Sequence, residues 1–532
     1  MESNQRNGLL SRSAHPMAPQ VKNQNQGEQS MNTHLFGFSR IQAAVPAAVV
    51  FALAATVGRA GGTPSPVLPQ PLFSDAQLIS SSTTPPTEAQ CESVGRRCFN
   101  PQSVQSAYNL APLYAAGLNG AGQTIAIIDS YGSDTIAHDL HVYNQAWALP
   151  PMCGEAGVTC APGMPTFSQL ELQGSPATKA PPPTSHGTGQ EDKAAWALEV
   201  SLDVETAHAI APMANILLVT TPTAETLGVQ GFPQMIAAED YVVQNHLATV
   251  ISQSLGAAEE SFNGVQSLLN LRYAFVDAAQ NGVTVLAASG DNGTANGTKS
   301  PVSKGGSLIP FPTVGWPASD PLVTGVGGTY LCTDPSAAAT APRTIAAGPP
   351  ATCVAFPLQA EIGWTFSGGG FSHVFAKPTY QNTLPAGSTA IATMRGVPDV
   401  AFQASAGTGA LVYITLPPDG SGGLLCGGAP CSTGWYDIGG TSLSTPQWAG
   451  LVAIGAQLNG GGLGLINPAL YKIGADASRY ASDFFDITVG NNQADPTVPG
   501  YPATTGWDPI TGLGTPNAAN LIPDLVSAVH GH

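Results

Sequence analysis

The sequence predicts an α/β protein whose mainly parallel β-sheet is flanked by helices on both faces. Short, continuous apolar runs of the kind that form buried parallel strands recur along the chain. Helix-length segments separate these runs, and strands that alternate with helices indicate a parallel sheet. Strands are expected at residues 122–129, 214–220, 248–256 and 282–290, and helices at residues 101–110, 194–209, 232–244 and 268–280.

Composition divides the chain into three regions. Residues 1–60 are expected to be a leader, because small residues follow the apolar run at residues 41–57, as in a secretory signal. Pro46 interrupts this short run, which argues against a membrane span, although a retained anchor is the alternative. We expect Met31 to be the true start, since it would give the leader an ordinary length. Residues 61–99 have the proline-rich composition of a linker or short pro-segment, and residues 100–532 are the expected folded domain.

Charge and cysteine content restrict the partners and the compartment. The 532 residues carry a net charge of −17, which argues against a nucleic-acid partner. Eight cysteines allow about 105 connectivities, and their close spacing favours short disulfide loops formed in an oxidising compartment. None of them forms a Cys-x-x-Cys pair, which argues against zinc. The expected pairs are Cys91 with Cys98, Cys153 with Cys160, Cys332 with Cys353, and Cys426 with Cys431.

The segment Gly439-Gly440-Thr441-Ser442 has the features of a turn that presents a nucleophilic serine. Its two glycines permit a tight turn, and an apolar, helix-like run follows at residues 451–454. Ser442 would therefore lie at the N-terminus of a helix, where the helix dipole and free N–H groups favour developing negative charge. An ordinary strand-to-helix turn is the alternative, so a base and an oxyanion donor must come from elsewhere in the chain.

Four acidic residues are candidates for those roles. Glu199 and Asp203 are four residues apart on an expected helix, so they share one face and could share a proton. A solvated helix face is the alternative, but the neighbouring residues are apolar. Asp291 directly follows an expected strand and would donate a hydrogen bond to an oxyanion while protonated, unless it is an ordinary turn residue. Asp129 ends another expected strand, at the edge where ligands gather in such sheets.

These motifs and their order resemble the sedolisin family of serine-carboxyl peptidases, whose fold is subtilisin-like. The resemblance covers roughly residue 101 to the C-terminus. It rests first on Glu199-x-x-Leu202-Asp203, Ser289-Gly290-Asp291 and Gly440-Thr441-Ser442-x-x-x-Pro446. Further matches are Ser252-x-Ser254-x-Gly256, Trp316-Pro317-Ala318-Ser319, Val326-Gly327-Gly328-Thr329, Ser367-Gly368-Gly369-Gly370-Phe371-Ser372, Val397-Pro398-Asp399-Val400-Ala401, and Asp486-Ile487-Thr488-x-Gly490 with Gly506-Trp507-Asp508-x-x-Thr511-Gly512.

The resemblance implies a serine-carboxyl endopeptidase in which Ser442 attacks the peptide carbonyl. Glu199 is the implied general base, oriented by Asp203, and Asp291 forms the oxyanion hole with the Ser442 N–H. Because Asp291 donates only while protonated and Glu199 accepts only while ionised, activity is expected at acidic pH. The expected protein is a secreted monomer that acts on proteins or peptides, without nucleic acid as a partner and without a membrane once the signal is removed.

The resemblance also implies one bound Ca²⁺ near the C-terminus. Its ligands would be the Asp486 and Asp508 side chains and the backbone carbonyls of Ile487, Thr504 and Gly506. Calcium prefers about six to eight oxygen ligands, which carboxylates and loop carbonyls supply. Thr504 stands where family members often have glycine, a small departure because the backbone carbonyl is the implied ligand. A loop with two solvated aspartates is the alternative.

Two other interpretations stay open. A subtilisin-type protease would use Asp129, His186 and Ser442, although His186 follows three prolines rather than lying on an evident apolar helix. The second alternative is a secreted, calcium-stabilised binding protein that has the same fold but no longer hydrolyses peptides. One departure from the family concerns activation, because residues 61–99 are too few for the long folded propeptide that it usually carries.

Overall fold

The computed structural model describes residues 75–180, 190–222, 231–298, 307–336, 343–416, 425–426, 429–430 and 433–531. The chain divides into two compact units after Gly62, and every described residue belongs to the second unit, Thr63–His532. The expected leader, the Met31 start and residues 61–74 therefore lie outside the described residues. Within the described ranges, no helix is both long and apolar enough to cross a membrane.

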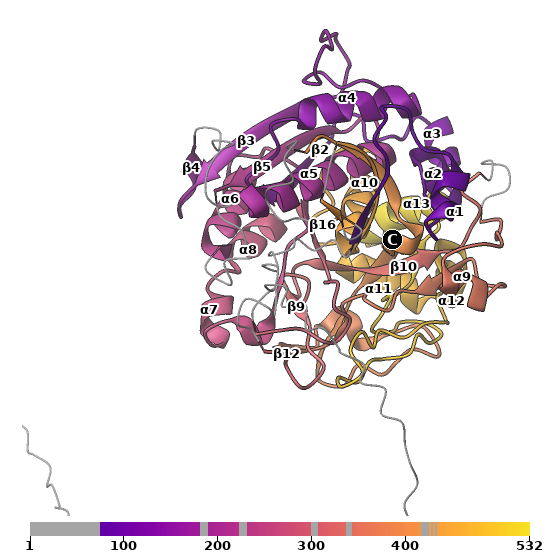
Figure 1. Ribbon diagram of the computed structural model, residues 1–532. Helices are drawn as coiled ribbons and strands as arrows, with labels where there is room; N and C mark the ends of the chain where they lie inside the picture. The colour runs from indigo at the N-terminus through magenta and orange to yellow at the C-terminus, as the bar shows by residue number, and fades with distance from the viewer. Residues whose placement is uncertain are drawn as a thin grey trace, which may run out of the picture. The chain divides into compact units, whose positions relative to one another are not determined.

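A mainly parallel sheet, nine-stranded in the described part of the chain, forms the centre of this unit (Figure 1). Its strands follow the order β11-β10-β8-β6-β2-β5-β3-β4, with β14 paired to β10. Neighbours are parallel except for the β10–β11 and β3–β4 pairs. The expected sheet is confirmed, and β2, β5, β6 and β8 match the four expected strands. The strands are β2 (Thr124–Ser130), β3 (Phe167–Gln173), β4 (Thr178–Lys179), β5 (Asn215–Thr221), β6 (Val250–Gln253), β8 (Thr284–Ala288), β10 (Thr324–Leu331), β11 (Glu361–Gly363) and β14 (Val400–Gln403).

Helices connect the strands and pack on the sheet (Figure 1). They are α1 (Glu88–Ser93), α2 (Pro101–Ala107), α3 (Ala111–Ala115), α4 (Ile136–Trp147), α5 (Gln190–Ile210), α6 (Phe232–Gln244), α7 (Val265–Leu269), α8 (Tyr273–Gln280), α9 (Ala351–Ala355), α10 (Thr441–Asn459), α11 (Asn467–Ala475), α12 (Ala477–Asp483) and α13 (Ala518–Val529). The helix expected at residues 268–280 is instead split into α7 and α8, because the Leu271 N–H bonds to the Leu268 carbonyl in a tight turn. The other three expected helices are confirmed as α2, α5 and α6.

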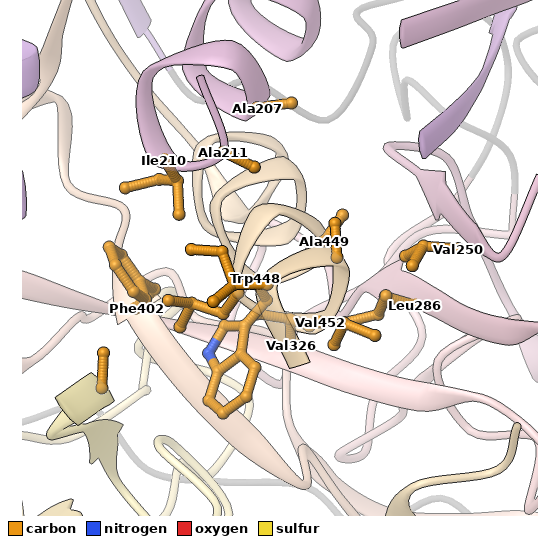
Figure 2. Close-up of a cluster of buried hydrophobic side chains, with 14 of the residues drawn as sticks. Ala207, Ile210, Ala211, Val250, Leu286, Val326, Phe402, Trp448, Ala449 and Val452 are labelled. Atoms are coloured by element: carbon orange, nitrogen blue, oxygen red, sulfur yellow. The ribbon is translucent and has the colours of Figure 1, made fainter. Parts of the chain in front are cut away.

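Both faces of the sheet are covered by apolar side chains. In β2, Ile125 and Ile127 join one buried cluster with α5 and α10, while Ala126 and Ile128 join another with α6 and α8. Successive side chains of a strand point to opposite faces, so a strand that is apolar at every position must be covered twice. The central helix α10 packs Trp448 and its neighbours against the sheet (Figure 2).

A second, three-stranded sheet leads into the segment that contains Ser442. In it, β1 (Asp75–Ser80) and β15 (Ala410–Ile414) flank β18 (Gly434–Gly439), and both pairings are antiparallel. Arg96 forms ion pairs with Asp75 and Asp437, one on each of two neighbouring strands. The later part of the expected linker is therefore ordered and packed beside the strand that leads to α10.

Three of the expected disulfides are confirmed: Cys91–Cys98, Cys153–Cys160 and Cys332–Cys353. Cys431 lies outside the described residues, so the fourth pair stays a prediction. No free cysteine occurs among the residues that the structure describes.

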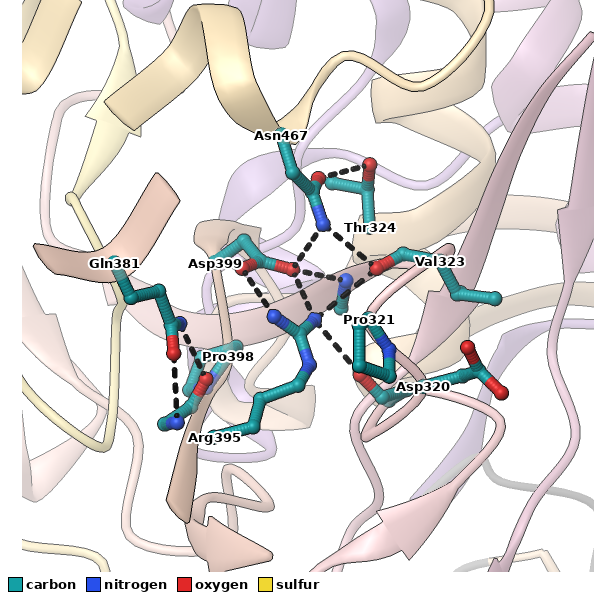
Figure 3. Close-up of polar contacts among 12 residues, drawn as sticks. Asp320, Pro321, Val323, Thr324, Gln381, Arg395, Pro398, Asp399 and Asn467 are labelled. Carbon is teal, nitrogen blue, oxygen red and sulfur yellow. Dashed lines mark hydrogen bonds and ion pairs between the residues drawn. The ribbon is translucent and has the colours of Figure 1, made fainter. Parts of the chain in front are cut away.

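A fully buried ion pair joins several elements around the amino ends of β10 and β14 (Figure 3). The Arg395 Nη2 atom lies 2.7 Å from the Asp399 Oδ2 atom, and both side chains are completely buried. Asp399 also accepts hydrogen bonds from the Gly325 N–H at 2.8 Å and the Tyr471 hydroxyl at 3.0 Å. Burial lowers the pKa of Arg395, but the Asp399 carboxylate outweighs it, so the pKa is raised and the guanidinium stays charged.

Replacing Asp399 with Ala should leave the buried Arg395 charge without its partner. We expect the free energy of unfolding to fall by about 3–5 kcal/mol, as for other buried pairs broken on one side. Urea denaturation monitored by circular dichroism measures this change. The control is Asp524→Ala, because Asp524 forms a longer, partly exposed ion pair with Arg479 at 3.7 Å, and such a pair contributes about 0–1 kcal/mol. Equal losses in the two variants would contradict the prediction.

Candidate active site

The candidate catalytic residues converge at the carboxyl edge of the parallel sheet. Asp129 lies near the end of β2, and Asp291 lies three residues after β8. Helix α5 carries Glu199 and Asp203, and helix α10 begins with Thr441 and Ser442. In parallel sheets this edge is where ligands and catalytic groups meet, because all the strands end there.

The turn before Ser442 depends on two glycines. A Cβ atom at Gly439 would come within 2.1 Å of the Ala406 nitrogen, and Gly440 has φ of 138°, a region that disfavours other residues. The chain can therefore pass directly from β18 into α10. Ser442 is completely buried, and its Oγ atom has no hydrogen-bond partner among the described residues. The predicted geometry, a serine hydroxyl in the first turn of a helix, is confirmed.

Asp291 is anchored to the residue that precedes the serine. Its Oδ1 atom accepts hydrogen bonds from the Thr441 N–H at 2.8 Å and the Thr441 hydroxyl at 2.7 Å. The same hydroxyl accepts a hydrogen bond from the Gly290 N–H at 3.1 Å. The Asp291 Oδ2 atom is buried and has no partner within the described part of the chain. Asp291 is thus fixed by its Oδ1 atom to the segment that carries Ser442, while its Oδ2 atom makes no hydrogen bond to the described residues.

The environment of Asp291 favours the protonated acid. Burial raises the pKa of this carboxyl to about 7, although the two Thr441 hydrogen bonds act in the opposite direction. A carboxylic acid that keeps its proton below neutral pH can donate a hydrogen bond, which a carboxylate cannot do.

Glu199 and Asp203 are both completely buried on α5, which is inconsistent with a solvated helix face. The Asp203 Oδ1 atom accepts a hydrogen bond from the Ser254 hydroxyl at 3.0 Å. The same hydroxyl lies 3.5 Å from the Ser442 carbonyl oxygen, so Ser254 connects the acidic helix to the serine segment. Burial, followed by the charges of Asp129 and Glu199, raises the pKa of Asp203 well above its usual range.

Asp129 completes a cluster of three buried carboxyl groups. Burial raises its pKa to about 8, so it holds a proton at acidic pH. Three carboxyl groups in one region of low polarity cannot all be ionised at once, because each negative charge disfavours the ionisation of the others. The cluster therefore carries fewer than three negative charges. His186, the base of the alternative subtilisin-type triad, lies outside the described residues.

Sequence reasoning did not assign roles to Thr441 and Ser254. Thr441 was visible only as the residue before Ser442, and Ser254 only as part of the motif Ser252-x-Ser254-x-Gly256. Their contacts join segments about 150 and 50 residues apart in sequence, which no local pattern reveals.

The five implied calcium ligands lie in the C-terminal loops. Asp508 is completely buried, which is inconsistent with two solvated aspartates, and its Oδ1 atom accepts the Ile510 N–H at 2.8 Å. The Asp486 Oδ1 atom accepts the Tyr480 hydroxyl at 3.0 Å. Among the described residues, the carbonyl oxygens of the other three ligands, Ile487, Thr504 and Gly506, accept no hydrogen bond. Two carboxylates and three free carbonyls are hard oxygen donors, which fit Ca²⁺.

A different kind of metal site is not found in the described ranges. No group of three or more His, Cys, Asp or Glu side chains there could hold a metal ion. This finding does not bear on the implied calcium site, because that site has only two carboxylate ligands. Its other three ligands are backbone carbonyl oxygens.

Comparison with known proteins agrees with this arrangement. The model of the subtilase family (Peptidase_S8) matches residues 120–464. Kumamolisin from Bacillus sp. (strain MN-32) is 32% identical over 448 residues, which cover 82% of this chain and 66% of that protein. Tripeptidyl-peptidase 1 from Homo sapiens is 29% identical over 361 residues, which cover 64% of this chain and 54% of that protein. The chain thus spans between about half and two thirds of the length of these curated relatives.

A solved structure supports the same relationship. Pseudomonas sedolisin, a serine-carboxyl proteinase complexed with two molecules of pseudo-iodotyrostatin, is similar with a TM-score of 0.57 and 26% identity. The match covers 80% of this chain and 98% of that chain, so the subtilisin-like fold is confirmed. The chain matches the subtilase family model and belongs to the sedolisin family of serine-carboxyl peptidases.

Proposed function

We propose that this chain is a serine-carboxyl endopeptidase that hydrolyses peptide bonds at acidic pH. The observation that carries the proposal is Asp291, a half-buried acid whose buried Oδ2 atom has no partner in the described residues and whose Oδ1 atom is fixed by Thr441. A protonated oxygen held beside a nucleophilic serine suits an oxyanion hole. Kumamolisin and sedolisin, to which the chain is similar, support the same reaction class.

In the proposed mechanism, the Ser442 Oγ atom attacks the peptide carbonyl carbon while Glu199 takes the hydroxyl proton. The carbonyl oxygen gains the negative charge and receives hydrogen bonds from protonated Asp291 and the Ser442 N–H. Glu199 then returns the proton to the leaving amine, and an acyl-enzyme forms. Water repeats the sequence and releases the acid product. Asp203, held by Ser254, positions Glu199 through the buried cluster.

The protonation states restrict this mechanism to a pH window. The pKa of Asp291 is raised by burial to about 7, so the donor is present below that pH and is lost as pH rises through it. Glu199 must be ionised to accept the serine proton, which sets the acidic limit. Activity is therefore expected at acidic pH, with a decline near pH 7.

Replacing Asp291 with Asn should remove the decline near pH 7. The asparagine amide donates a hydrogen bond at every pH, whereas the aspartate loses its donor when it ionises. We expect kcat/KM of Asp291→Asn to stay nearly constant through this region, and kcat of Asp291→Ala to fall by about 10²–10³-fold. Stopped assays across a pH series measure both effects.

The control for this experiment is Asn292→Ala, because Asn292 is exposed and adjacent to the proposed donor. Its pH profile should match the wild type. If Asn292→Ala loses activity while Asp291→Asn keeps the wild-type profile, the oxyanion donor is the asparagine of a subtilisin-type site and the proposal is wrong.

The identity of the base is tested by three substitutions. Ser442→Ala and Glu199→Gln should each lower kcat by on the order of 10⁴-fold or more, since loss of a nucleophile or base is rarely compensated. His186→Ala should retain activity. Loss of activity in His186→Ala, with Glu199→Gln unaffected, would support the triad of Asp129, His186 and Ser442 instead.

We also propose that one Ca²⁺ stabilises the C-terminal loops. Asp486 and Asp508 would supply carboxylate oxygens, and Ile487, Thr504 and Gly506 would supply carbonyl oxygens. When bound, the ion would neutralise the two carboxylates and hold two chain segments together. The buried position of Asp508 supports this role, because the Thr504, Ile510 and Thr511 N–H groups bond to its carboxylate but no ion pair neutralises it within the described residues, so a bound cation would offset the cost of burying the charge.

Chelation of calcium should lower the unfolding temperature of the wild type but not of Asp508→Ala. A ligand present at about 100 times its Kd stabilises a fold by about 2.7 kcal/mol, so removing it gives a measurable decrease in Tm. Differential scanning calorimetry with CaCl₂ or EGTA measures the effect. Asp495→Ala is the control, since the Asp495 carboxylate bonds to Thr497 within its own turn. An equal calcium response in Asp508→Ala and the control would exclude this site.

We further propose that the protein is secreted, acts as a monomer on proteins or peptides, and has neither a nucleic-acid partner nor a membrane attachment after signal removal. The three disulfides in the described residues support an oxidising compartment. Fractionation of a producing culture, followed by N-terminal sequencing of the extracellular protein, tests the location and the boundary of the leader.

A further inference from the structure

A short segment runs antiparallel to the chain that carries Asp291. The Gly293 N–H donates to the Phe366 carbonyl at 2.8 Å, and the Gly368 N–H donates to the Gly290 carbonyl at 2.7 Å. The two segments are so close that a Cβ atom at Gly368 would lie 2.1 Å from the Ser289 oxygen. Phe366 is therefore held directly beside the proposed oxyanion group.

The backbone around Phe366 is rigidly fixed. The Ser367 side chain is completely buried, donates to the Ile510 carbonyl at 2.7 Å and accepts from the Gly328 N–H at 2.9 Å. Trp364 is buried, and its ring meets the Phe366 ring edge-on at 5.7 Å between centroids. The Phe366 side chain is nevertheless 42% exposed. An apolar ring on a fixed backbone is thus presented to solvent next to Asp291.

The order of the strands places Phe366 on one side of the proposed scissile bond. Strand β8, which leads to Asp291, lies between β6 and β10. Strand β6 continues into Ser254, which contacts Asp203 and the Ser442 carbonyl. The segment that ends at Phe366 follows β11, beyond β10 on the other side. Ser254 and Phe366 therefore flank Asp291 from opposite sides.

We propose that Phe366 is a specificity-determining residue, whose exposed ring receives an apolar or aromatic side chain of the substrate next to the scissile bond. The inference rests on the proposed peptidase function. A peptide whose scissile carbonyl reaches Asp291 and Ser442 extends in both directions from that point. The half of the peptide that extends away from Ser254 passes the Phe366 ring. An apolar side chain of the peptide at this point would pack on the ring and be removed from water.

The test compares cleavage of a peptide library by the wild type and by Phe366→Ala, with kcat/KM measured at each position around the scissile bond. In the wild type, one position should favour apolar or aromatic side chains. In Phe366→Ala that preference should weaken by about tenfold, a size expected for a lost hydrophobic subsite contact, while the other positions keep their preferences. Phe366→Leu should retain most of the preference, because leucine restores an apolar wall.

The matched control is Phe356→Ala, since Phe356 directly follows α9 and has a similar exposed fraction, 44%. Its library profile should equal that of the wild type. A Phe366→Ala variant with the wild-type side-chain preferences would overturn the inference. So would an equal decrease in kcat/KM for side chains at every substrate position in both Phe366 variants. A wild type that cleaves no peptide, or cleavage that persists in Ser442→Ala, would overturn the proposed function itself.

Discussion

The removal of several carboxyl groups from water is the constraint on which the site depends. Glu199, Asp203 and Asp129 are completely buried, and the Oδ2 atom of half-buried Asp291 is buried next to the segment that carries Ser442. Low polarity favours the neutral acid, so protons are retained in the cluster at pH values where exposed carboxyls would be charged. The chemistry proposed here follows directly, because a retained proton converts an acceptor into a hydrogen-bond donor at the place where negative charge develops.

Apolar packing of the surrounding fold offsets the free-energy cost of burying these carboxyl groups. Helix α5 contributes Trp196, Leu198 and Val200 to three different buried clusters, so apolar contacts surround it on several sides. The Arg395–Asp399 pair is a contrasting case, because both of its groups stay ionised in the core. Direct pairing and further hydrogen bonds stabilise the two charges there. The Asp399 carboxylate is thus neutralised by a buried cation, whereas burial raises the pKa values of Asp129 and Asp203 and keeps protons on these acids.

Local patterns predicted much of the fold, and with the family resemblance they predicted which residues form the candidate site, but they did not predict the contacts among these residues. The segment 122–129 predicted a buried strand, because its four consecutive apolar residues, 125–128, need an apolar environment on both faces of the sheet. The spacing of Glu199 and Asp203 predicted a shared helix face. The contacts of Ser254 with Asp203 and of Thr441 with Asp291 depend on how distant segments pack. The ordered strand β1 was also missed, because its pairing with β18 spans more than 350 residues.

Thr441 has a mechanical consequence for the site. Because Thr441 bonds Asp291 through its N–H and its hydroxyl and directly precedes Ser442, it connects the proposed nucleophile to the proposed oxyanion donor. The proposed base, Glu199, belongs to a different element, helix α5. Where α5 and α10 meet, a Cβ atom at Gly450 would lie 2.7 Å from the Ile210 side chain, so the two helices touch with almost no spare room. In the proposed mechanism, the position of Glu199 relative to Ser442 therefore depends on how closely α5 and α10 pack, and substitutions at this helix–helix contact are expected to change the rate.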